Sequence, residues 1–264
     1  MNKFGKIINY ETGAVYFRAE NIPAPHGFST RLGGVSTIPH LASMNMGFTL
    51  GDDPENVKEN YRRMAADIGF DAGNIVFTKQ IHSTDVRVVG KSDTGNTYEC
   101  DGFVTNERDI VLTVRTADCV PVLLCDPKAH ICSAVHAGWR GTASGICINA
   151  VDRMRRLGAD PGNVRAAIGA AIQKCCYEVG EDMRDSVKNT AGKDICDRFI
   201  TDTDGRLYAD IVGMNIYMLV SAGVAKDNIA SLGECTCCRH DLFFSHRASK
   251  GKRGVMCAAI ANIY

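Results

Sequence analysis

Three residues of types that bind metals in enzymes lie where apolar stretches of the sequence end. They are His82 in "TKQIHSTD", Cys119 in "RTADCV" and His136 in "SAVHAGWRG". Two imidazoles and one thiolate suit zinc, and three protein ligands leave a fourth position for water or substrate, as in a catalytic site. Seven histidines and twelve cysteines offer many such triplets. The alternative interpretation is therefore a strand-end histidine beside a buried thiol.

The elements expected around these residues place them at strand ends. The segment 110–126, "IVLTVRTADCVPVLLCD", is rich in β-branched residues and contains a proline, which predicts two strands meeting at a bend around Asp118 and Cys119. Residues 130–137 predict another strand, and residues 141–158 predict a helix closed by Gly158. His136 therefore lies where a strand gives way to a helix, among small residues that let a ligand approach the backbone closely.

Strands and helices alternate through most of the chain. Residues 5–17 predict a hairpin, and Asp53 and Pro54 predict the N-cap and first turn of a helix. Further strands are expected at 75–90, 164–172, 228–234, 241–246 and 254–263, and further helices at 180–191 and 208–223. No linker or repeat divides the chain, so we expect a single α/β domain over 1–264 with mixed sheets layered with helices.

Composition restricts the classes of partner. Thirty basic and thirty acidic residues cancel, so no net field draws the chain to nucleic acid or to an anionic membrane. Neither a signal peptide nor a segment of transmembrane length is expected, which predicts a cytoplasmic protein with reduced cysteines. A small, modestly charged ligand fits this composition, and no protein partner can be inferred.

Four long segments resemble the signatures of one family. In chain order they are "TKQIHSTDV", "DGFVTNERDIVLTVRTADCVPVLLCDP", "AVHAGWRG" and "CCYEVGEDM". They resemble the YfiH family, also called the laccase-domain or multicopper polyphenol oxidoreductase family. The resemblance runs from "HGFSTRLGGVS" near the start to "CTCCRHDLFFSHRA" near the end, which is nearly the whole chain.

The resemblance implies a fold, a metal and a chemistry. The fold is that of YfiH, layered like the cytotoxic necrotizing factor deamidases, and the metal is a zinc ion on His82, Cys119 and His136. The activities are phosphorolysis of adenosine, inosine and methylthioadenosine and deamination of adenosine, with a purine nucleoside and phosphate as substrates. Some bacterial members are described instead as peptidoglycan editing factors.

Phosphorolysis requires groups that hold an anion and a ribose. Arg31 and Arg140 each lie among glycines and offer guanidinium groups for phosphate, although both could equally be solvated loop residues. Asn45 and Gln80 offer neutral amides for ribose hydroxyls or base edges. We expect these four residues in the wall of the binding site.

Three rival interpretations follow from the same inventory. A copper oxidase needs more imidazoles than seven and no His-x-His pair occurs, so copper is expected only as an adventitious occupant. A metal-free hydrolase could use Cys119 as nucleophile with His136 as base. A structural zinc on the segment "CTCCRHDLFFSH" is disfavoured because paired CxxC arms are missing, and Cys175 and Cys176 are expected to cap a strand before a helix. The candidate structural ligands in that segment are Cys235, Cys237, Cys238, His240 and His246.

Overall fold

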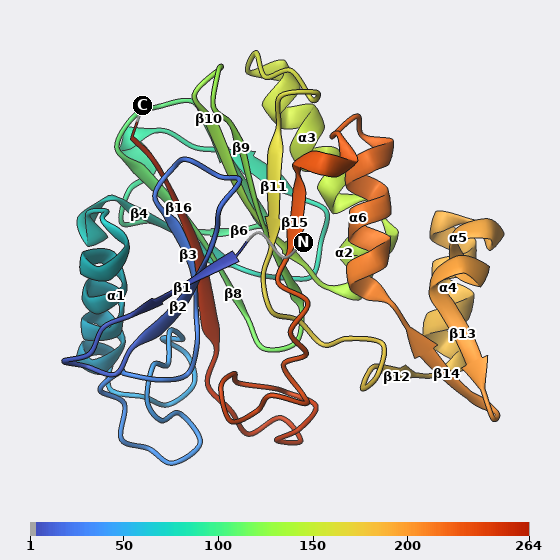
Figure 1. Cartoon of the computed structure of the whole chain (residues 1–264), viewed down its shortest axis with the longest axis horizontal. Helices are drawn as coiled ribbons and strands as arrows, with labels where there is room; N and C mark the ends of the chain where they lie inside the picture. The colour runs from blue at the N-terminus through green and yellow to red at the C-terminus, as the bar shows by residue number, and fades with distance from the viewer. Residues whose placement is uncertain (1–3, 264) are drawn as a thin grey trace.

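The computed structural model describes residues 4–263 (Figure 1). The strands are β1 Phe4–Ile8, β2 Val15–Ala19, β3 His26–Ser29, β4 Ile75–Lys79, β5 Val86–Val88, β6 Thr97–Glu99, β7 Gly102–Thr105, β8 Ile110–Thr116, β9 Val120–Asp126, β10 Ile131–Ala137, β11 Arg165–Ile168, β12 Glu178–Val179, β13 Ile200–Thr203, β14 Arg206–Ala209, β15 Ile229–Ser231 and β16 Met256–Asn262. The helices are α1 Pro54–Ile68, α2 Trp139–Ala143, α3 Ile146–Arg156, α4 Glu181–Ala191, α5 Lys193–Phe199 and α6 Ile211–Ser221, with short 3₁₀ turns at Ala72–Asn74, Lys91–Asp93 and Lys226–Asn228.

Two mixed sheets pack face to face at the centre of the molecule. The first has the strand order β1-β2-β3-β16-β8-β4-β6, and the second has the order β15-β11-β9-β10-β7-β5. One apolar cluster joins them, with Leu112 and Ala258 from the first sheet and Leu123 and Ala134 from the second. The central strands are buried along their whole length, as expected for strands covered on both faces.

Helices cover the outer faces of both sheets (Figure 1). Helix α1 packs Tyr61 and Met64 against Ile75 and Cys257 of the first sheet. Helices α2, α3 and α6 cover the second sheet and share one large apolar cluster with it. A small third sheet, β12-β14-β13, lies with α4 and α5 at one end of the molecule. The α/β class and the mixed sheets expected from the sequence are thus confirmed.

Several predicted elements match the structure closely. Residues 5–17 form the β1–β2 hairpin, in which Ile8 pairs with Val15. Asp53 caps α1 by accepting a hydrogen bond from the Glu55 amide, and Gly69 ends the helix in the left-handed conformation. The bend at Asp118 and Cys119 separates β8 from β9, and it also carries the chain from one sheet to the other.

Two predicted elements were wrong in form. The helix expected over 141–158 is broken into α2 and α3, because Gly145 has a φ of +83° and begins a new helix. Residues 241–246 form turns instead of a strand. Phe243 and Phe244 bury their rings in an apolar cluster without any strand pairing, so hydrophobicity alone suggested a strand there.

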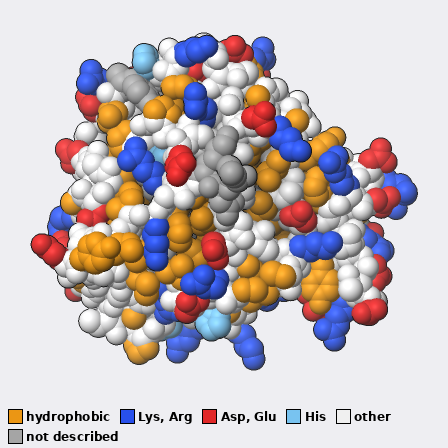
Figure 2. All heavy atoms as spheres, in the orientation of Figure 1, with side chains coloured by type: hydrophobic (Ala, Val, Ile, Leu, Met, Phe, Trp, Pro, Cys, Tyr) orange, Lys and Arg blue, Asp and Glu red, His pale blue; other side chains and the backbone are white. Residues whose placement is uncertain are grey.

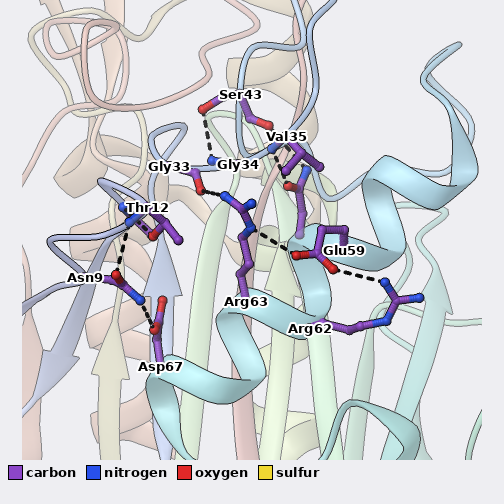
Figure 3. A network of polar contacts seen from close by, with 12 residues as sticks. Asn9, Thr12, Gly33, Gly34, Val35, Ser43, Glu59, Arg62, Arg63 and Asp67 are labelled. Atoms are coloured by element: carbon purple, nitrogen blue, oxygen red, sulfur yellow. Dashed lines mark hydrogen bonds and ion pairs between the residues drawn. The ribbon is translucent and has the colours of Figure 1, made fainter.

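Helix α1 also anchors the long loop that precedes it (Figure 3). Arg63 donates a hydrogen bond to the Gly33 carbonyl at 2.9 Å and pairs with Glu59. The buried Asn60 accepts from the Val35 amide at 2.9 Å and donates to the Asn45 carbonyl at 2.8 Å. These contacts hold residues 33–47 against the sheet, and the same loop continues into the wall of the site described below.

The surface carries no dominant charge on the face that Figure 2 shows. Acidic and basic side chains alternate there with small apolar areas. This mixture agrees with the formal net charge of +0. Within residues 4–263 no helix has the length and apolar character needed to cross a bilayer.

Candidate active site and metal centre

His82, Cys119 and His136 come together at the ends of three strands. His82 follows β4, Cys119 stands immediately before β9, and His136 is the penultimate residue of β10. The His82 Nε2 and Cys119 Sγ atoms are 4.0 Å apart, and the two imidazole rings meet edge to face with centroids 4.9 Å apart. The ligand atoms of all three residues lie within 4.8 Å of one another.

These positions fit one tetrahedral metal ion. Zn–N and Zn–S distances of about 2.0 and 2.3 Å place neighbouring donor atoms roughly 3.5 Å apart, so only small adjustments would close the shell. Gly138 allows this approach, because a Cβ atom built there would lie 2.8 Å from the His82 ring and 3.6 Å from Cys119 Sγ. A glycine at position 138 is therefore required by the site.

Asp101 fixes both histidines from behind. Its fully buried carboxylate accepts a hydrogen bond from His136 Nδ1 at 2.8 Å, and it also accepts from the backbone amides of His82 and Ser83. His136 Nε2 is thereby left free to face Cys119, and His82 is held in a left-handed conformation with φ +60°. A carboxylate behind a histidine ligand is the usual support of a metal site. The sequence analysis did not identify Asp101, since nothing in "ECDGF" marks a partner 35 residues away.

The electrostatics of the metal-free site favour an ion pair. Burial opposes ionisation of Cys119, but the charge of His136 and hydrogen bonds to both histidines outweigh it and lower the pKa of the thiol to about 6. Burial likewise disfavours the charged form of His136, yet the Cys119 thiolate and the Asp101 hydrogen bond raise its pKa to about 9. Burial of Asp101 is outweighed by hydrogen bonds from His136 and Ser83, and its pKa falls to about 2. Cys119 is thus already a thiolate near neutral pH, and it can bind a cation without first losing a proton.

The triad opens into a cavity of about 780 Å³. Phe48 and Phe77 supply aromatic surface to its wall, and Lys79, Arg115 and Arg253 supply positive charge. A volume of this order holds a ligand of nucleoside size. The cavity brings the loop after β3, the end of β4 and the start of β9 to one place.

Two of the four predicted wall residues lie at this cavity or directly behind it. Gln80 lines it, and its side-chain amide exchanges two hydrogen bonds with the backbone of Arg115 at 2.6 and 2.8 Å. Asn45 is fully buried behind the wall, where it bonds Gly47 and Asp52. Both amides position other wall groups, and their contact with a ribose stays a prediction.

The two predicted arginines lie outside the residues that line this cavity. Arg31 donates to the carbonyls of Ala42 and His240 and borders a smaller hollow of about 110 Å³ that shares Arg253. Arg140 is exposed on α2, where its guanidinium lies 4.3 Å from the centroid of the Trp139 ring. Their binding of phosphate also stays a prediction.

Arg253 is a cationic group that the sequence analysis missed. It lines the cavity beside the triad, and its Nε is a buried donor without a hydrogen-bond partner among the described residues. Burial lowers the pKa of its guanidinium, while the nearby Asp118 and Cys119 oppose that shift. An unsatisfied buried donor on a cation is a natural contact for an anionic ligand.

Asp118, although adjacent to Cys119, is committed to the scaffold. Its carboxylate accepts hydrogen bonds from Thr236 Oγ1 at 2.6 Å and from the Arg247 amide at 2.7 Å. Its φ of +93° turns the chain sharply between the two sheets. This residue therefore ties the bend that carries Cys119 to two later segments of the chain.

Comparisons with known proteins identify the family of the chain. The sequence model of the family described as "Multi-copper polyphenol oxidoreductase laccase" matches residues 25–262. The chain belongs to this family. A purine nucleoside phosphorylase of Deinococcus radiodurans is 38% identical over 94% of this chain and 93% of its own length. An adenosine deaminase, RL5, from an unknown prokaryotic organism is 32% identical over 87% of this chain and 90% of its own length.

A solved structure confirms the family fold. The hypothetical protein YfiH of Bacillus licheniformis superimposes with a TM-score of 0.87 at 33% sequence identity, covering 93% of this chain and 96% of that one. The laccase in the family's description does not fit the donor set found here. Within residues 4–263, the triad and a cluster of four cysteines are the groups whose ligand atoms gather within 4.8 Å, and together they contain two histidines. A multicopper oxidase needs more imidazole ligands than that.

Proposed function

We propose that this chain is a zinc-dependent purine nucleoside enzyme. Its proposed reactions are the phosphorolysis of adenosine, inosine and methylthioadenosine and the deamination of adenosine. The observation that carries the proposal is a His-Cys-His triad that opens into a cavity of nucleoside size, lined also by Arg253, whose Nε donor has no partner among the described residues. The names of relatives, a purine nucleoside phosphorylase and an adenosine deaminase, support the same substrate class.

His82, Cys119 and His136 are the residues that would hold the zinc ion. When bound, the ion supplies a Lewis acid that polarises water or a substrate oxygen at its open position. Asp101 keeps the His136 proton on Nδ1, so that Nε2 presents a lone pair to the metal. This arrangement excludes both histidines from acid–base roles during turnover.

The aromatic wall is proposed to receive the purine base. Phe48 and Phe77 meet edge to face with centroids 5.8 Å apart and leave part of their surface to the cavity. A flat heterocycle gains both apolar burial and ring contact there. At the adjoining edge, the two hydrogen bonds between the Gln80 side chain and the Arg115 backbone fix the shape of the pocket.

Arg253 is proposed to hold phosphate during phosphorolysis. In that reaction a hydrogen phosphate oxygen bonds to ribose C1′ while the bond from C1′ to the base nitrogen breaks. The departing base keeps the electron pair and takes up the proton that the phosphate gives up. A guanidinium can hold the anionic phosphate in place for this step through charged hydrogen bonds. Lys79 is already paired with Glu99 at 2.7 Å, and the Arg115 guanidinium donates to the Thr78 carbonyl. Arg253, whose Nε has no partner among the described residues, is therefore the better-placed cation.

A nucleoside screen with and without phosphate tests the proposal. Purified zinc-containing protein is mixed with each nucleoside, and the products are separated by chromatography. With phosphate we expect free base and ribose 1-phosphate, and without phosphate we expect inosine and ammonia from adenosine. Absence of both product sets in metal-replete protein contradicts the proposed function.

A metal-free cysteine hydrolase is the second candidate. The series Cys119, His136 and Asp101 has the order of a nucleophile, a base and an orienting carboxylate, and Cys119 ionises readily. The two candidates differ in their use of His82. His82→Ala should abolish zinc binding at the triad and turnover in the zinc enzyme, whereas a thiolate hydrolase would retain activity and resist chelators.

A further inference from the structure

A second cluster of sulfur ligands lies outside the cavity. The Sγ atoms of Cys175, Cys176, Cys235 and Cys238 all lie within 4.8 Å of one another. They come from two turns that are about 60 residues apart in the sequence. The proposed nucleoside chemistry makes no use of this cluster.

The spacing of the sulfur atoms fits a shared ion. Cys175 and Cys176 are 3.9 Å apart at sulfur, and they lie 3.6 and 3.4 Å from the sulfur of Cys238. Four sulfurs at about 2.3 Å from a tetrahedral zinc ion lie roughly 3.8 Å from one another. A disulfide would need a sulfur–sulfur distance of about 2.05 Å. The three measured distances agree with the edge of a tetrahedron.

The backbone holds the two turns in place. Ala171 and Cys235 form a parallel β-bridge, and the Thr236 amide donates to the Ala171 carbonyl at 3.1 Å. The Gln173 amide points at the Cys235 sulfur from 3.5 Å. Figure 1 shows the chain after β11 and the chain after β15 running along the same side of the molecule. Backbone contacts therefore bring the four cysteines together, so the site is already formed before an ion binds.

One positive group lies against the cluster. Arg247 donates to the carbonyls of Cys176 and Glu178 at 3.0 and 2.9 Å, whereas Arg239, next to Cys238 in the sequence, is paired with Glu234 and Asp241. Four thiolates around a divalent ion leave a net charge of about −2, which nearby cations stabilise. Soft thiolate donors in a closed set of four select zinc over magnesium or calcium.

We propose that Cys175, Cys176, Cys235 and Cys238 form a second, structural zinc site. Paired CxxC arms are absent from this region, as the sequence analysis noted. Cys235 and Cys238 make one such arm, and the vicinal pair Cys175–Cys176 replaces the other. Cys237, His240 and His246 are not members of the cluster.

The proposed zinc site would stabilise the segments that support the active site. Asp118, next to Cys119, binds Thr236 and Arg247 through its carboxylate and the Ile172 amide through its carbonyl. Both cysteine turns are thus attached to the bend that presents Cys119. An ion that joins the turns would keep this bend in one position, as structural zinc sites do.

Zinc stoichiometry in three single variants tests the proposal. Full-length protein is purified in reducing buffer without chelator, and zinc is measured per chain. We expect about two zinc ions per chain in the wild type, one at the four-cysteine site and one at the triad, and about one in Cys238→Ser. Cys237→Ser, a neighbouring thiol outside the cluster, is the matched control and should keep both ions. Loss of an ion in this control would overturn the assigned ligand set.

Cys119→Ser separates the two sites and avoids any folding defect in the cysteine turns. It should retain one zinc ion, and X-ray absorption should show a shell of sulfur atoms alone at about 2.3 Å. A metal-free Cys119→Ser protein, or a shell containing nitrogen, overturns the structural site and leaves the proposed function intact. A Cys176–Cys238 disulfide found by mass spectrometry in wild-type protein purified in this buffer would also overturn it.

Discussion

At the scale of single residues, the candidate site depends on hydrogen bonds that set protonation. Asp101 is the central example, because one carboxylate orients His136 and holds the backbone of His82 and Ser83. Removing its charge keeps the shape of the side chain but weakens the acceptor behind His136. The consequence should be seen first in metal affinity and only later in the fold.

Asp101→Asn should reduce zinc affinity about 10- to 100-fold, the usual effect of losing a carboxylate behind a metal-bound histidine. Competition with a coloured chelator measures the affinity directly. Asp85→Asn changes an exposed carboxylate in the same region and serves as the control. Equal affinities in both variants would show that Asp101 does not support the metal site.

The reactivity of Cys119 in chelated protein should reveal its lowered pKa. With thiol and imidazole pKa values of about 6 and about 9, the ion pair exists between these limits. Because the pKa of Cys119 lies below its ordinary value, the stabilisation is present at higher pH and is lost as the pH falls through about 6. Because the pKa of His136 is raised, its share is lost as the pH rises through about 9.

Iodoacetamide labelling of Cys119, followed by mass spectrometry across this pH range, measures the midpoint. We expect it near pH 6 in the chelated wild type. In His136→Ala it should move up toward that of an ordinary thiol, because the stabilising charge is gone. A midpoint that is the same in both proteins contradicts the ion pair.

Arg253→Ala and Arg140→Ala together locate the phosphate. Arg253 has an unsatisfied buried Nε at the cavity, whereas Arg140 stacks on Trp139 outside it. A lost charged hydrogen bond of about 1.5–3 kcal/mol weakens phosphate-dependent turnover on the order of ten- to a hundredfold. We expect that loss in Arg253→Ala with deamination less affected. A larger phosphate effect in Arg140→Ala would instead place the anion at α2.

At the scale of elements, the turns and loops that follow the strands determine which side chains line the cavity. The strand-end position of His136 works only because the next turn has no side chain at Gly138. The loop before α1 reaches the cavity because Asn60 of that helix satisfies several of its backbone groups. The role of Gly138 and the role of Asn60 can each be tested by substitution with alanine.

Gly138→Ala should remove the active-site metal with little loss of stability. Its Cβ would press on the His82 ring, so that ring must move out of reach of the ion. Zinc content and thermal unfolding should be measured together. Gly162→Ala, where a Cβ meets Asp160 at an ordinary 3.4 Å, is the control. Full zinc occupancy in Gly138→Ala would mean that the triad tolerates a wider turn.

Asn60→Ala should destabilise the protein and weaken substrate binding. Removing this buried amide leaves the Val35 amide and the Asn45 carbonyl without their partner, at about 1–3 kcal/mol in the free energy of unfolding. The loop carrying Phe48 then loosens, which should raise KM more than it lowers kcat. Urea unfolding and steady-state kinetics give the two quantities, with exposed Asn149→Ala as control. Unchanged KM would separate this loop from substrate binding.

At the scale of the whole molecule, the two large sheets share one core. Their facing residues form a single apolar cluster. The bend at Asp118, between β8 of the first sheet and β9 of the second, and the end of β10 both contribute residues to the candidate site. Division into separately stable halves would expose that cluster to water. This packing favours the single domain expected from the sequence.

Unfolding should therefore be cooperative. Trp139 is the only tryptophan and packs against the outer apolar layer of the second sheet, so its fluorescence follows that half of the molecule. Far-ultraviolet circular dichroism follows all elements. In reduced, metal-saturated protein the two denaturant transitions should coincide. Separate midpoints would show that the sheets unfold as independent units.

The local elements could be predicted from the sequence, and so could the three candidate ligands His82, Cys119 and His136. Capping residues predicted α1, turn residues predicted the first hairpin, and the strand bend at Cys119 followed from composition within a short window. These features depend on interactions between near neighbours. The long family signatures added the identity of the three ligands.

The groups that meet across long sequence distances follow from the tertiary structure. The assignment of β8 and β9 to different sheets, the support from Asp101, the cation at Arg253 and the four-cysteine cluster all join segments far apart in the chain. Such contacts depend on strand order and register, which local propensity does not encode. For the same reason, the residues that sequence patterns placed at phosphate, Arg31 and Arg140, lie beyond the cavity wall, because the path of the backbone fixes where a side chain can reach.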